Sequence, residues 1–414
     1  MNGIYEVYKL SSTGAIASLI DRYTSLEGEL NWSKPGSFVI SGTCIGSNPL
    51  ALTDRIVINR NGTRLFTGIV TELTTDCADV ENNIKTWQAV ISGDDIVLDW
   101  RCVFATGNNA APANIEIAED VYDKIPNDED ETSTRSALDR MLYYIRKHIG
   151  PNAAADRQLV TVSATEDDTR GEQGRSAYHI KQLSDVLEEI GADSGLYCKV
   201  NTNTAGTRVL TIPDPRDRTA DLVISPEFGN VAGWHREELY PEFNAVWMLS
   251  GITNKKNEDD TTTQTRVWVY SEDADSIAKY GRIEKVVTKS DIKVVYEDPE
   301  KEDIVPVTEE EVRKLLEDEA ARQLKDNAAA LKWTVTMMET NACAFMDNWI
   351  LGDRVHCVID GEAFDSQIET VAISYAAGLE TVTPTIGEVE TGIYGKLFKT
   401  LNGIDTRLKA KEEN

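Results

Sequence analysis

The sequence contains few of the residue patterns on which most enzymes and metal proteins rely. Only four of its 414 residues are histidine, and none stands in a metal-binding spacing such as H-E-x-x-H. P-loop, G-x-S-x-G and G-x-G-x-x-G motifs are absent as well. The 70 Asp and Glu residues could include a glycosidase pair, but the sequence does not single out two of them. We therefore predict no catalytic, cofactor-binding or metal-ligating residue, and no cofactor.

Cysteine is also scarce, and long apolar runs are absent. The six cysteines have no C-x-x-C pair and are predicted to be buried free thiols rather than a disulfide framework. No apolar run is long enough to span a bilayer, and the opening MNGIYEVYKL lacks the features of a secretory signal. We expect folding in a reducing cytoplasm and no stable membrane insertion. The cysteines are Cys44, Cys77, Cys102, Cys198, Cys343 and Cys357.

Basic residues are far outnumbered by acidic ones. Lys and Arg number 42 against the 70 acidic residues, which gives a formal net charge of −28 at pH 7. Such a chain repels both a phosphate backbone and an anionic membrane surface. The hydrophobic fraction of 41% is nevertheless ordinary for a globular protein, so we expect two or three folded domains without specific nucleic-acid binding.

Residues 1–105 are predicted to form a first β domain. Alternating or apolar runs of strand length cover 4–8, 26–32, 37–40, 56–58, 65–66 and 84–91. Pro35-Gly36 and Asn61-Gly62 lie between neighbouring runs, and Asn-Gly is the typical type I′ hairpin turn. Several short strands with such turns predict a small barrel or sandwich.

Residues 106–217 are predicted to form a small α/β domain. Apolar residues repeat at i, i+3, i+4 and i+7 in 138–149 and 183–190, which predicts two amphipathic helices. Gly150-Pro151 and Gly191 end them. Strands are expected near 196–200 and 208–212. The acidic stretch 127–131 lacks the spacing of a calcium-binding loop and is predicted to be a solvated loop.

Residues 218–390 are predicted to return to β structure, with a helical insertion near 308–331. Strands are expected at 245–249, 267–270 and within 333–388, with a polar turn at 257–261. Thr308 to Glu311 forms a capping box at the start of the helix. Residues 391–414 are expected to be a charged tail or docking helix. The apolar helix face is assigned to Val312, Leu315, Leu316 and Leu324, and the strand tryptophans Trp32, Trp247, Trp268 and Trp333 are assigned to the core.

An internal repeat links the two β regions. Leu52-Thr53-Asp54-Arg55-Ile56, followed by Asn61-Gly62, corresponds to Leu351-Gly352-Asp353-Arg354-Val355, followed by Asp360-Gly361, at an offset of 299 residues. One residue is then dropped, and the offset is 298 for Phe66 with Phe364 and for Leu73 with Val371. Any two amphipathic hairpins look somewhat alike, but the shared Leu-x-Asp-Arg favours two copies of one β module.

Several stretches, taken in order, resemble the tail-hub proteins at the baseplate or tail tip of long-tailed bacteriophages and related phage-tail-like particles. The similarity runs from about Ile4 to Gly387 and rests on the order in which the stretches follow one another. The stretches are Tyr5-Glu6-Val7-Tyr8, residues 20–26 and 35–38, residues 183–190 with Ser194-Gly195-Leu196, residues 224–230, Tyr240 with Asn244-Ala245-Val246, residues 351–355, and Thr383-Pro384-Thr385-Ile386-Gly387.

This resemblance implies a mainly β fold with α+β parts: two tube-like β-barrel domains related by internal duplication, a small α/β domain and one long helix. It implies a homotrimer with a structural role and no active site, and we expect no appended peptidoglycan-cleaving domain. Three chains with two similar barrels would match a sixfold tail tube to a threefold tip. The implied partners are the tail tube or distal tail protein, the tape-measure protein and spike or fibre proteins.

The implied location is the virion tail tip, assembled in the bacterial host cytoplasm, where the ring would let DNA or an effector pass. Acidic side chains lining that passage would repel phosphates. Two alternatives stay open: a carbohydrate- or receptor-binding tail module that uses exposed aromatic residues, and a cell-wall hydrolase with an unrecognised carboxylate pair.

Overall fold

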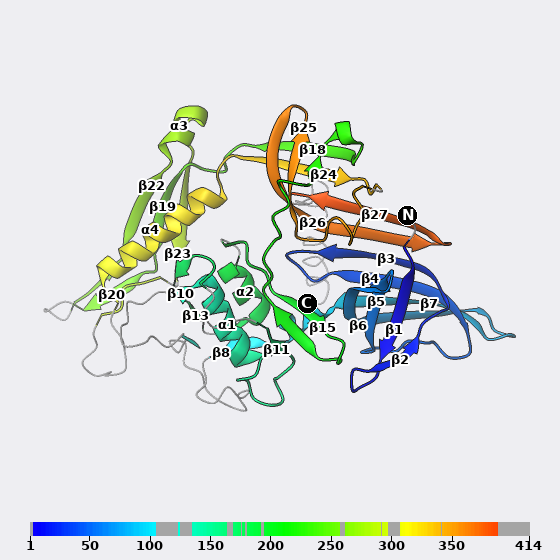
Figure 1. Ribbon diagram of the computed structural model, residues 1–414. Helices are drawn as coiled ribbons and strands as arrows, with labels where there is room; N and C mark the ends of the chain where they lie inside the picture. Colours follow the sequence, from blue (N-terminus) through cyan, green and yellow to red (C-terminus); the bar gives the residue numbers. More distant parts are fainter. Residues whose placement is uncertain are drawn as a thin grey trace. The chain divides into compact units, whose positions relative to one another are not determined.

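The chain is mainly β and forms two compact units in a computed structural model (Figure 1). One unit comprises Met1–Trp234 and Thr334–Asn414, and the other comprises His235–Trp333. The predictions for 127–131, for most of the turn at 257–261 and for 391–414 lie outside the described residues. The structure describes residues 3–104, 123–124, 135–163, 169–174, 176–178, 180–191, 194–256, 261–290, 292–296, 307–340 and 342–387.

The N-terminal module consists of seven antiparallel strands in the order β3-β4-β7-β6-β5-β1-β2. Alternate residues of these strands face the core, where Leu26, Phe38, Ile40 and Ile91 are fully buried. Its expected strands are confirmed. The bounds are β1 Tyr5–Leu10, β2 Ile16–Leu19, β3 Tyr23–Asn31, β4 Ser37–Ile45, β5 Arg55–Arg60, β6 Thr63–Asp79 and β7 Ile84–Gly93, followed by the 3-10 helix η1, Asp94–Trp100.

The C-terminal module arranges its strands in a matching order, β18-β24-β27-β26-β25-β17. The two modules join through β26 and β3 into a 13-stranded sheet that has β18 and β2 at its ends. Closure of either module into a tube stays a prediction. The bounds are β17 Val223–Ile224, β18 Val231–Leu239, β24 Ala330–Met337, β25 Arg354–Ile359, β26 Glu362–Ala376 and β27 Leu379–Ile386; the 3-10 helix η3, Pro226–Phe228, precedes β18.

The two hairpins that carry the sequence repeat share their local geometry. Asn61-Gly62 and Asp360-Gly361 both have positive φ angles, 52° and 74° in one turn and 52° and 80° in the other, as a type I′ turn requires. Leu65 is the residue that has no counterpart in the second copy. It forms a bulge in the pairing of β5 with β6, whereas β25 and β26 pair without interruption. A second bulge occupies corresponding positions, Thr71 in β6 and Glu369 in β26.

The segment between the modules contains the two helices that the sequence predicts. Ser136 caps α1, whose buried side chains pack with those of α2 around one apolar core. Strands β11, β15 and β16 border this core, and β8 pairs with β14. The bounds are α1 Ala137–His148, α2 Leu183–Gly191, β8 Cys102–Phe104, β9 Asp123–Lys124, β10 Arg135–Ser136, β11 Thr161–Val162, β12 Gln173–Gly174, β13 Ala177–Tyr178, β14 Ile180–Gln182, β15 Lys199–Thr202 and β16 Arg208–Thr211.

The second unit is a small sheet covered on one face by a long helix. Strand β19 lies between β22 and β23, and α4 packs on the sheet through Val312, Leu316 and Ala320. The capping box at Thr308 is confirmed. No helix of the described residues has the length and apolarity of a membrane span. The bounds are β19 Ala245–Ser250, β20 Thr253–Lys256, β21 Thr262–Thr265, β22 Trp268–Glu272, α3 Ala274–Tyr280, β23 Glu284–Lys289 and α4 Glu309–Asp326.

Several expectations for this unit and for the cysteines are wrong in detail. Helix α4 ends at Asp326 rather than near 331, because Asn327 caps it and β24 begins at Ala330. Leu315 is 49% exposed, since it lies off the face that contacts the sheet. Trp247 and Trp268 are 37% and 56% exposed on the sheet, whereas Trp32 and Trp333 are buried as expected. All six cysteines are free, but only Cys343 and Cys357 are buried as expected; Cys77 is exposed, and Cys44, Cys102 and Cys198 are partly exposed.

Candidate functional site

The described residues form no constellation typical of an enzyme or a metal centre. No group of three or more His, Cys, Asp or Glu side chains among them could hold a metal ion. His148 is fully buried and stacks on Tyr144, with ring centroids 6.3 Å apart. His356 faces Asp365 across the β25–β26 hairpin at 2.7 Å, and the neighbouring Cys357 is buried on the opposite face. These contacts explain His148 and His356 as structural residues.

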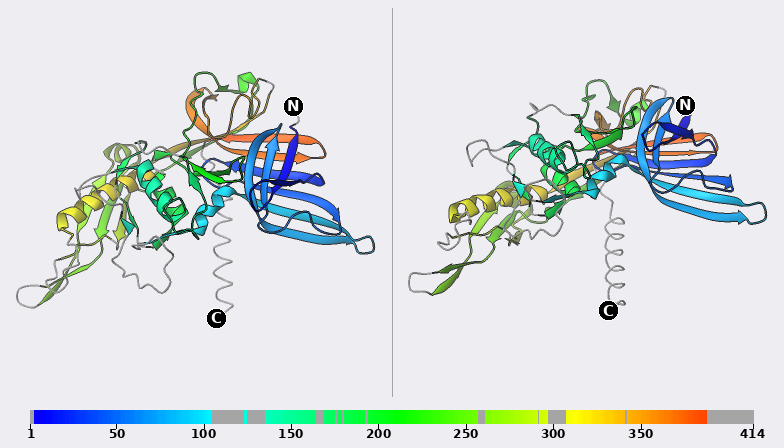
Figure 2. Two further views of the ribbon diagram at one scale, coloured as in Figure 1. Left: turned by 60° about the horizontal axis from the view of Figure 1, so that its bottom comes forward. Right: turned by 90° about the horizontal axis from the view of Figure 1, so that it is seen from below.

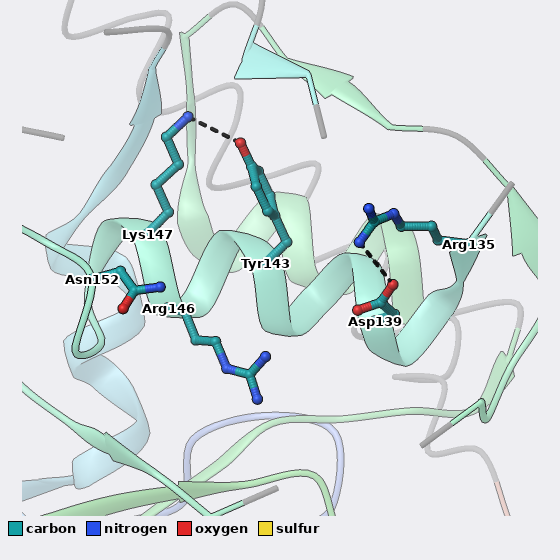
Figure 3. Close-up of a pocket in the computed structure, with 6 residues that line it drawn as sticks. All are labelled: Arg135, Asp139, Tyr143, Arg146, Lys147 and Asn152. Carbon is teal, nitrogen blue, oxygen red and sulfur yellow. Dashed lines mark hydrogen bonds and ion pairs between the residues drawn. The ribbon is translucent and has the colours of Figure 1, made fainter. Parts of the chain in front are cut away.

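A hollow of about 300 Å³ lies along helix α1 (Figure 3). Arg135 forms an ion pair with Asp139 at 3.2 Å, and the Lys147 ammonium donates to the Tyr143 hydroxyl at 3.2 Å. Basic side chains near the C-terminal end of α1 suit its helix dipole. Several basic side chains and one carboxylate line the hollow. They do not provide the paired nucleophile and general base that a catalytic site would need.

The strongest long-range feature is the joint between the two modules. Strand β26 pairs antiparallel with β3 over seven residue pairs, from Thr370 with Asn31 to Ala376 with Ser25. The strands are separated by more than 300 residues in sequence, so this pairing closes the chain upon itself. Beside it, a pocket of about 590 Å³ is lined by residues of β1, β3 and the β26–β27 turn. The joint is therefore the contact that holds the two modules of one chain together.

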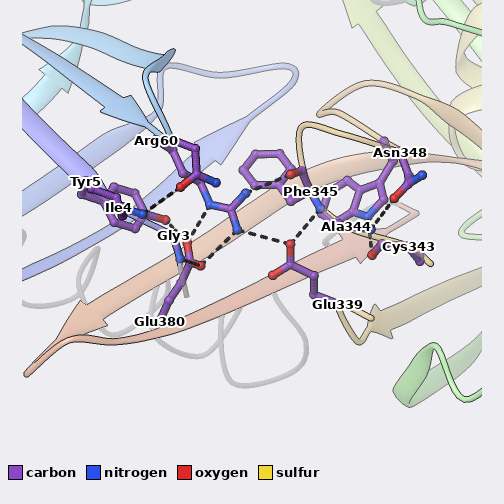
Figure 4. Close-up of polar contacts among 12 residues, drawn as sticks. Gly3, Ile4, Tyr5, Arg60, Glu339, Cys343, Ala344, Phe345, Asn348 and Glu380 are labelled. Carbon is purple, nitrogen blue, oxygen red and sulfur yellow. Dashed lines mark hydrogen bonds and ion pairs between the residues drawn. The ribbon is translucent and has the colours of Figure 1, made fainter. Parts of the chain in front are cut away.

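A buried ion pair fixes the two modules to each other (Figure 4). The side chains of Arg60 in β5 and Glu380 in β27 are only 4% and 1% exposed. The Arg60 guanidinium donates to both Glu380 oxygens, at 2.7 and 3.0 Å, and to the Phe345 carbonyl at 2.9 Å. Glu339 lies 3.3 Å from the same guanidinium. Such a paired, hydrogen-bonded cluster specifies one arrangement of the modules.

Two more groups of the N-terminal module complete this cluster. The Tyr5 hydroxyl and the Gly3 amide both donate to Glu380, so its carboxylate accepts bonds on both oxygens. Burial alone would raise the pKa of Glu380, but the hydrogen bonds from Arg60 and Tyr5 lower it below its ordinary value. Burial, followed by the bond to Glu380, raises the pKa of Tyr5. Glu380 is thus held ionised between its partners.

The repeated aspartates have the same role in both modules. Asp54 Oδ2 and Asp353 Oδ2 each accept a hydrogen bond from the backbone amide three residues earlier, at 2.8 and 2.9 Å. Each carboxylate also meets a cation: Lys9 at 2.6 Å for Asp54, and Arg216 at 2.7 and 2.6 Å for Asp353. The Leu-x-Asp-Arg motif is therefore a turn that anchors the start of each hairpin.

A second polar cluster attaches the N-terminal module to the α/β segment. Asp94 accepts hydrogen bonds from Thr202 Oγ1 at 2.6 Å and from Arg208 Nε at 3.0 Å, and Lys199 lies 3.3 Å from Asp95. Burial raises the pKa of Asp95 above its ordinary value, and the nearby Lys199 ammonium only partly offsets this rise. Sequence reasoning missed these aspartates and the Arg60 cluster. The signal was weak, namely an Asp-Asp pair that directly follows a strand.

Comparisons with known proteins agree on one kind of fold. A family model described as "Siphovirus ReqiPepy6 Gp37-like protein" matches residues 6–388. No curated protein matches the sequence. The solved prophage MuSo2 43 kDa tail protein from Shewanella oneidensis is similar, with a TM-score of 0.53, 12% identity, and coverage of 92% of this chain and 97% of that one. The prophage tail protein gp18 from Listeria monocytogenes is similar with a TM-score of 0.50 and 9% identity, and the match covers 97% of this chain and 99% of that one.

Proposed function

Because the chain belongs to the Siphovirus ReqiPepy6 Gp37-like family, we propose that it is the structural hub of a phage tail tip or baseplate. Three copies form a ring that adapts the sixfold tail tube to a threefold tip and lets DNA or an effector pass. The solved proteins of similar fold are themselves described as tail proteins, which supports this assignment.

The observation that carries the proposal is the shared architecture of the two modules. Both contain the hairpin of the sequence repeat, a bulge at corresponding positions of β6 and β26, and a matching order of neighbouring strands, although β17 pairs parallel with β25 where β1 pairs antiparallel with β5. We interpret them as tube-like β domains related by internal duplication, at 1–105 and 218–390, with an α/β domain at 106–217 and a tail at 391–414. In a ring of three chains, such modules occupy six similar positions.

The rest of the proposal concerns partners and passage. One face of the ring seats on the tail tube or distal tail protein, and the tape-measure protein and spike or fibre proteins contact the same assembly. The location is the virion tail tip, reached after assembly in the bacterial cytoplasm. The net charge of −28 suits a conduit that must not hold the DNA that passes through it. This role requires no catalysis, so we propose that the chain is not an enzyme.

Labelling of intact particles tests the role directly. Gold-labelled antibodies raised against the purified chain should bind the distal end of the tail in electron micrographs of phage particles. Antibodies against the major tail-tube protein serve as the control and should label the whole length of the tail. Labelling of the capsid, or of the tail shaft alone, would contradict the proposal.

A second candidate function rests on the exposed aromatic residues of the second unit. The rings of Trp247, Trp268 and Tyr270 lie close together, with centroids 5.4 and 4.7 Å from Trp247, and face away from α4. Exposed aromatic groups of this kind favour a carbohydrate- or receptor-binding tail module. Saturable binding of the isolated chain to host cells, lost in Trp268→Ala, would support that reading over a purely structural one.

A further inference from the structure

In the part of the chain that the structure describes, one edge of strand β6 has no partner strand along half its length. Among the described residues, β5 pairs with β6 only as far as Ile69, whereas β7 follows the other edge to Asp79. The residues from Glu72 to Cys77 therefore present unpaired backbone groups, and their side chains are mostly exposed. In Figure 2 the β6–β7 hairpin, in light blue, extends beyond the neighbouring strands. An open edge of this kind is a template for another strand.

The corresponding edge in the C-terminal module is occupied. Residues Thr370–Tyr375 of β26 correspond to Glu72–Cys77, and they pair antiparallel with Asn31–Leu26 of β3. The strand next to each segment also corresponds, since Cys77 faces Lys85 in β7 and Tyr375 faces Glu380 in β27. The segment that lacks a partner strand in the N-terminal module is therefore the segment that forms the joint in the C-terminal module.

Strand β18 is the counterpart of β3, and among the described residues no further strand follows it in the large sheet. It borders β24 as β3 borders β4, and it ends the strand order of the large sheet. Strands β4 and β24 can be aligned through the strands they pair with. Phe38 in β4 faces Ile91 in β7, and Val335 in β24 faces Ile386 in β27; Ile91 and Ile386 occupy corresponding positions, so Phe38 corresponds to Val335. Three residues further on, Ser41 therefore corresponds to Met338.

The register of β18 follows from one hydrogen bond. The Met338 amide donates to the Asn230 carbonyl at 2.9 Å, while Ser41 faces Ser25 across β4 and β3. Asn230 therefore corresponds to Ser25, and Val231, the next residue along, takes the position that Leu26 holds in β3.

We propose that β18 of one copy pairs antiparallel with the Glu72–Cys77 edge of β6 in the next copy, in the register of the internal β26–β3 joint. This inference rests on the proposed ring and names its contact surface. The register places Val231 opposite Cys77 and Arg236 opposite Glu72. Opposite charges in directly facing positions stabilise a strand pair, so Arg236, which also forms an ion pair with Glu238 in its own strand, favours this register through Glu72.

The joint between copies lacks the buried ion pair of the internal joint. By the same correspondence, Arg60 is replaced by Ile359 and Glu380 by Lys85. Backbone hydrogen bonds and facing side chains therefore hold the copies together without a charged cluster at the core. We infer that the internal joint is permanent, whereas the joint between copies forms and separates with protein concentration.

Disulfide trapping tests this register in the full chain. The variant Val231→Cys places a thiol opposite the native, exposed Cys77, at a spacing between facing strand residues that a disulfide can bridge. Under mild oxidation we expect covalent dimers and trimers on a non-reducing gel, and mass spectra should contain a peptide pair that joins Cys77 to the introduced thiol. The double variant Val231→Cys/Cys77→Ser should lose them. Ala232→Cys is the matched control, because its side chain points to the other face of the strand.

The outcomes separate the strand register from the ring itself. A threefold particle by mass measurement, with no more cross-linking in Val231→Cys than in Ala232→Cys, would overturn the proposed edge contact and leave the ring intact. An absence of both cross-links and oligomers at high concentration would overturn both. A disulfide between Cys77 and the introduced thiol that forms only within single chains would also overturn the contact between copies.

Charge reversal gives a second test that does not depend on a disulfide. Glu72 is exposed, so Glu72→Lys should fold normally, but it sets two cations opposite each other across the proposed contact. We expect association to weaken by about threefold to tenfold at low salt, measured by sedimentation. Glu81→Lys, in the β6–β7 turn beyond the contact, is the matched control and should leave association unchanged. Equal effects of the two substitutions would contradict the proposed register.

Discussion

At the scale of single residues, a small number of buried charges fix how distant parts of the chain meet. Arg60 and Glu380 connect strands 320 residues apart, and Asp353 anchors the second hairpin through Arg216. The sequence marked Asp54 and Asp353 through their repeated motif, because a turn with fixed hydrogen bonds leaves a local signature. Arg60 has no such signature, because its partners Glu380, Phe345 and Glu339 lie 320, 285 and 279 residues away in the chain.

Removal of the Arg60 guanidinium should destabilise the joint strongly. Arg60→Ala leaves the carboxylate of Glu380 buried without its cation, so we expect a loss of about 3–5 kcal/mol in the free energy of unfolding. Denaturant unfolding measures this loss. Arg22→Ala, at an exposed position in the same module, is the control and should change stability by no more than about 0.5 kcal/mol. Equal effects would show that the ion pair does not hold the joint.

The same cluster makes stability depend on acidic pH. The pKa of Glu380 is lower in the folded chain than in the unfolded one, so its contribution is complete above the unfolded value of about 4.3 and is lost as pH falls through the folded value. We expect the difference in Tm between the native chain and Glu380→Gln to stay constant from pH 7 to about 5 and to shrink below about pH 4. A difference that grows on acidification would contradict this assignment.

At the scale of elements, local periodicity predicted most strands and both helices of the α/β segment. Helix α1 was found because its apolar residues form one stripe with a clear stop at Gly150-Pro151. The end of α4 was missed, because Ala328 to Leu331 are strong helix formers and continue the helical pattern, whereas tertiary contacts select a strand from Ala330 onward. Trp247 and Trp268 were misplaced because an apolar strand residue does not reveal which face of a sheet is covered.

The bulge at Leu65 offers a test of the repeat at this scale. Deletion of Leu65 should convert the first hairpin to the uninterrupted pairing of the second, so the side chains beyond it keep their faces. We expect a drop in Tm of only a few degrees in calorimetry. Deletion of Thr67, two residues further on, should instead shift the register and turn buried residues outward. Equal loss of folding in both deletions would contradict the correspondence.

At the scale of the whole molecule, the joint between modules could not have been predicted from the sequence. Pairing of β26 with β3 depends on two edges that no local pattern connects; the strand-like runs, the repeat and the family resemblance indicated a second module but not its contact with the first. Once the internal joint is known, it serves as a template for the proposed pairing of the β6 edge with the terminal strand β18.

The most direct measurement is the mass and symmetry of the purified chain, obtained by mass photometry together with electron micrographs of single particles. The account predicts particles of three times the 45.9 kDa chain, seen end-on as a ring with a central opening and six similar lobes around it. A chain that stays single up to high concentration, or a ring with a number of copies other than three, would contradict the account.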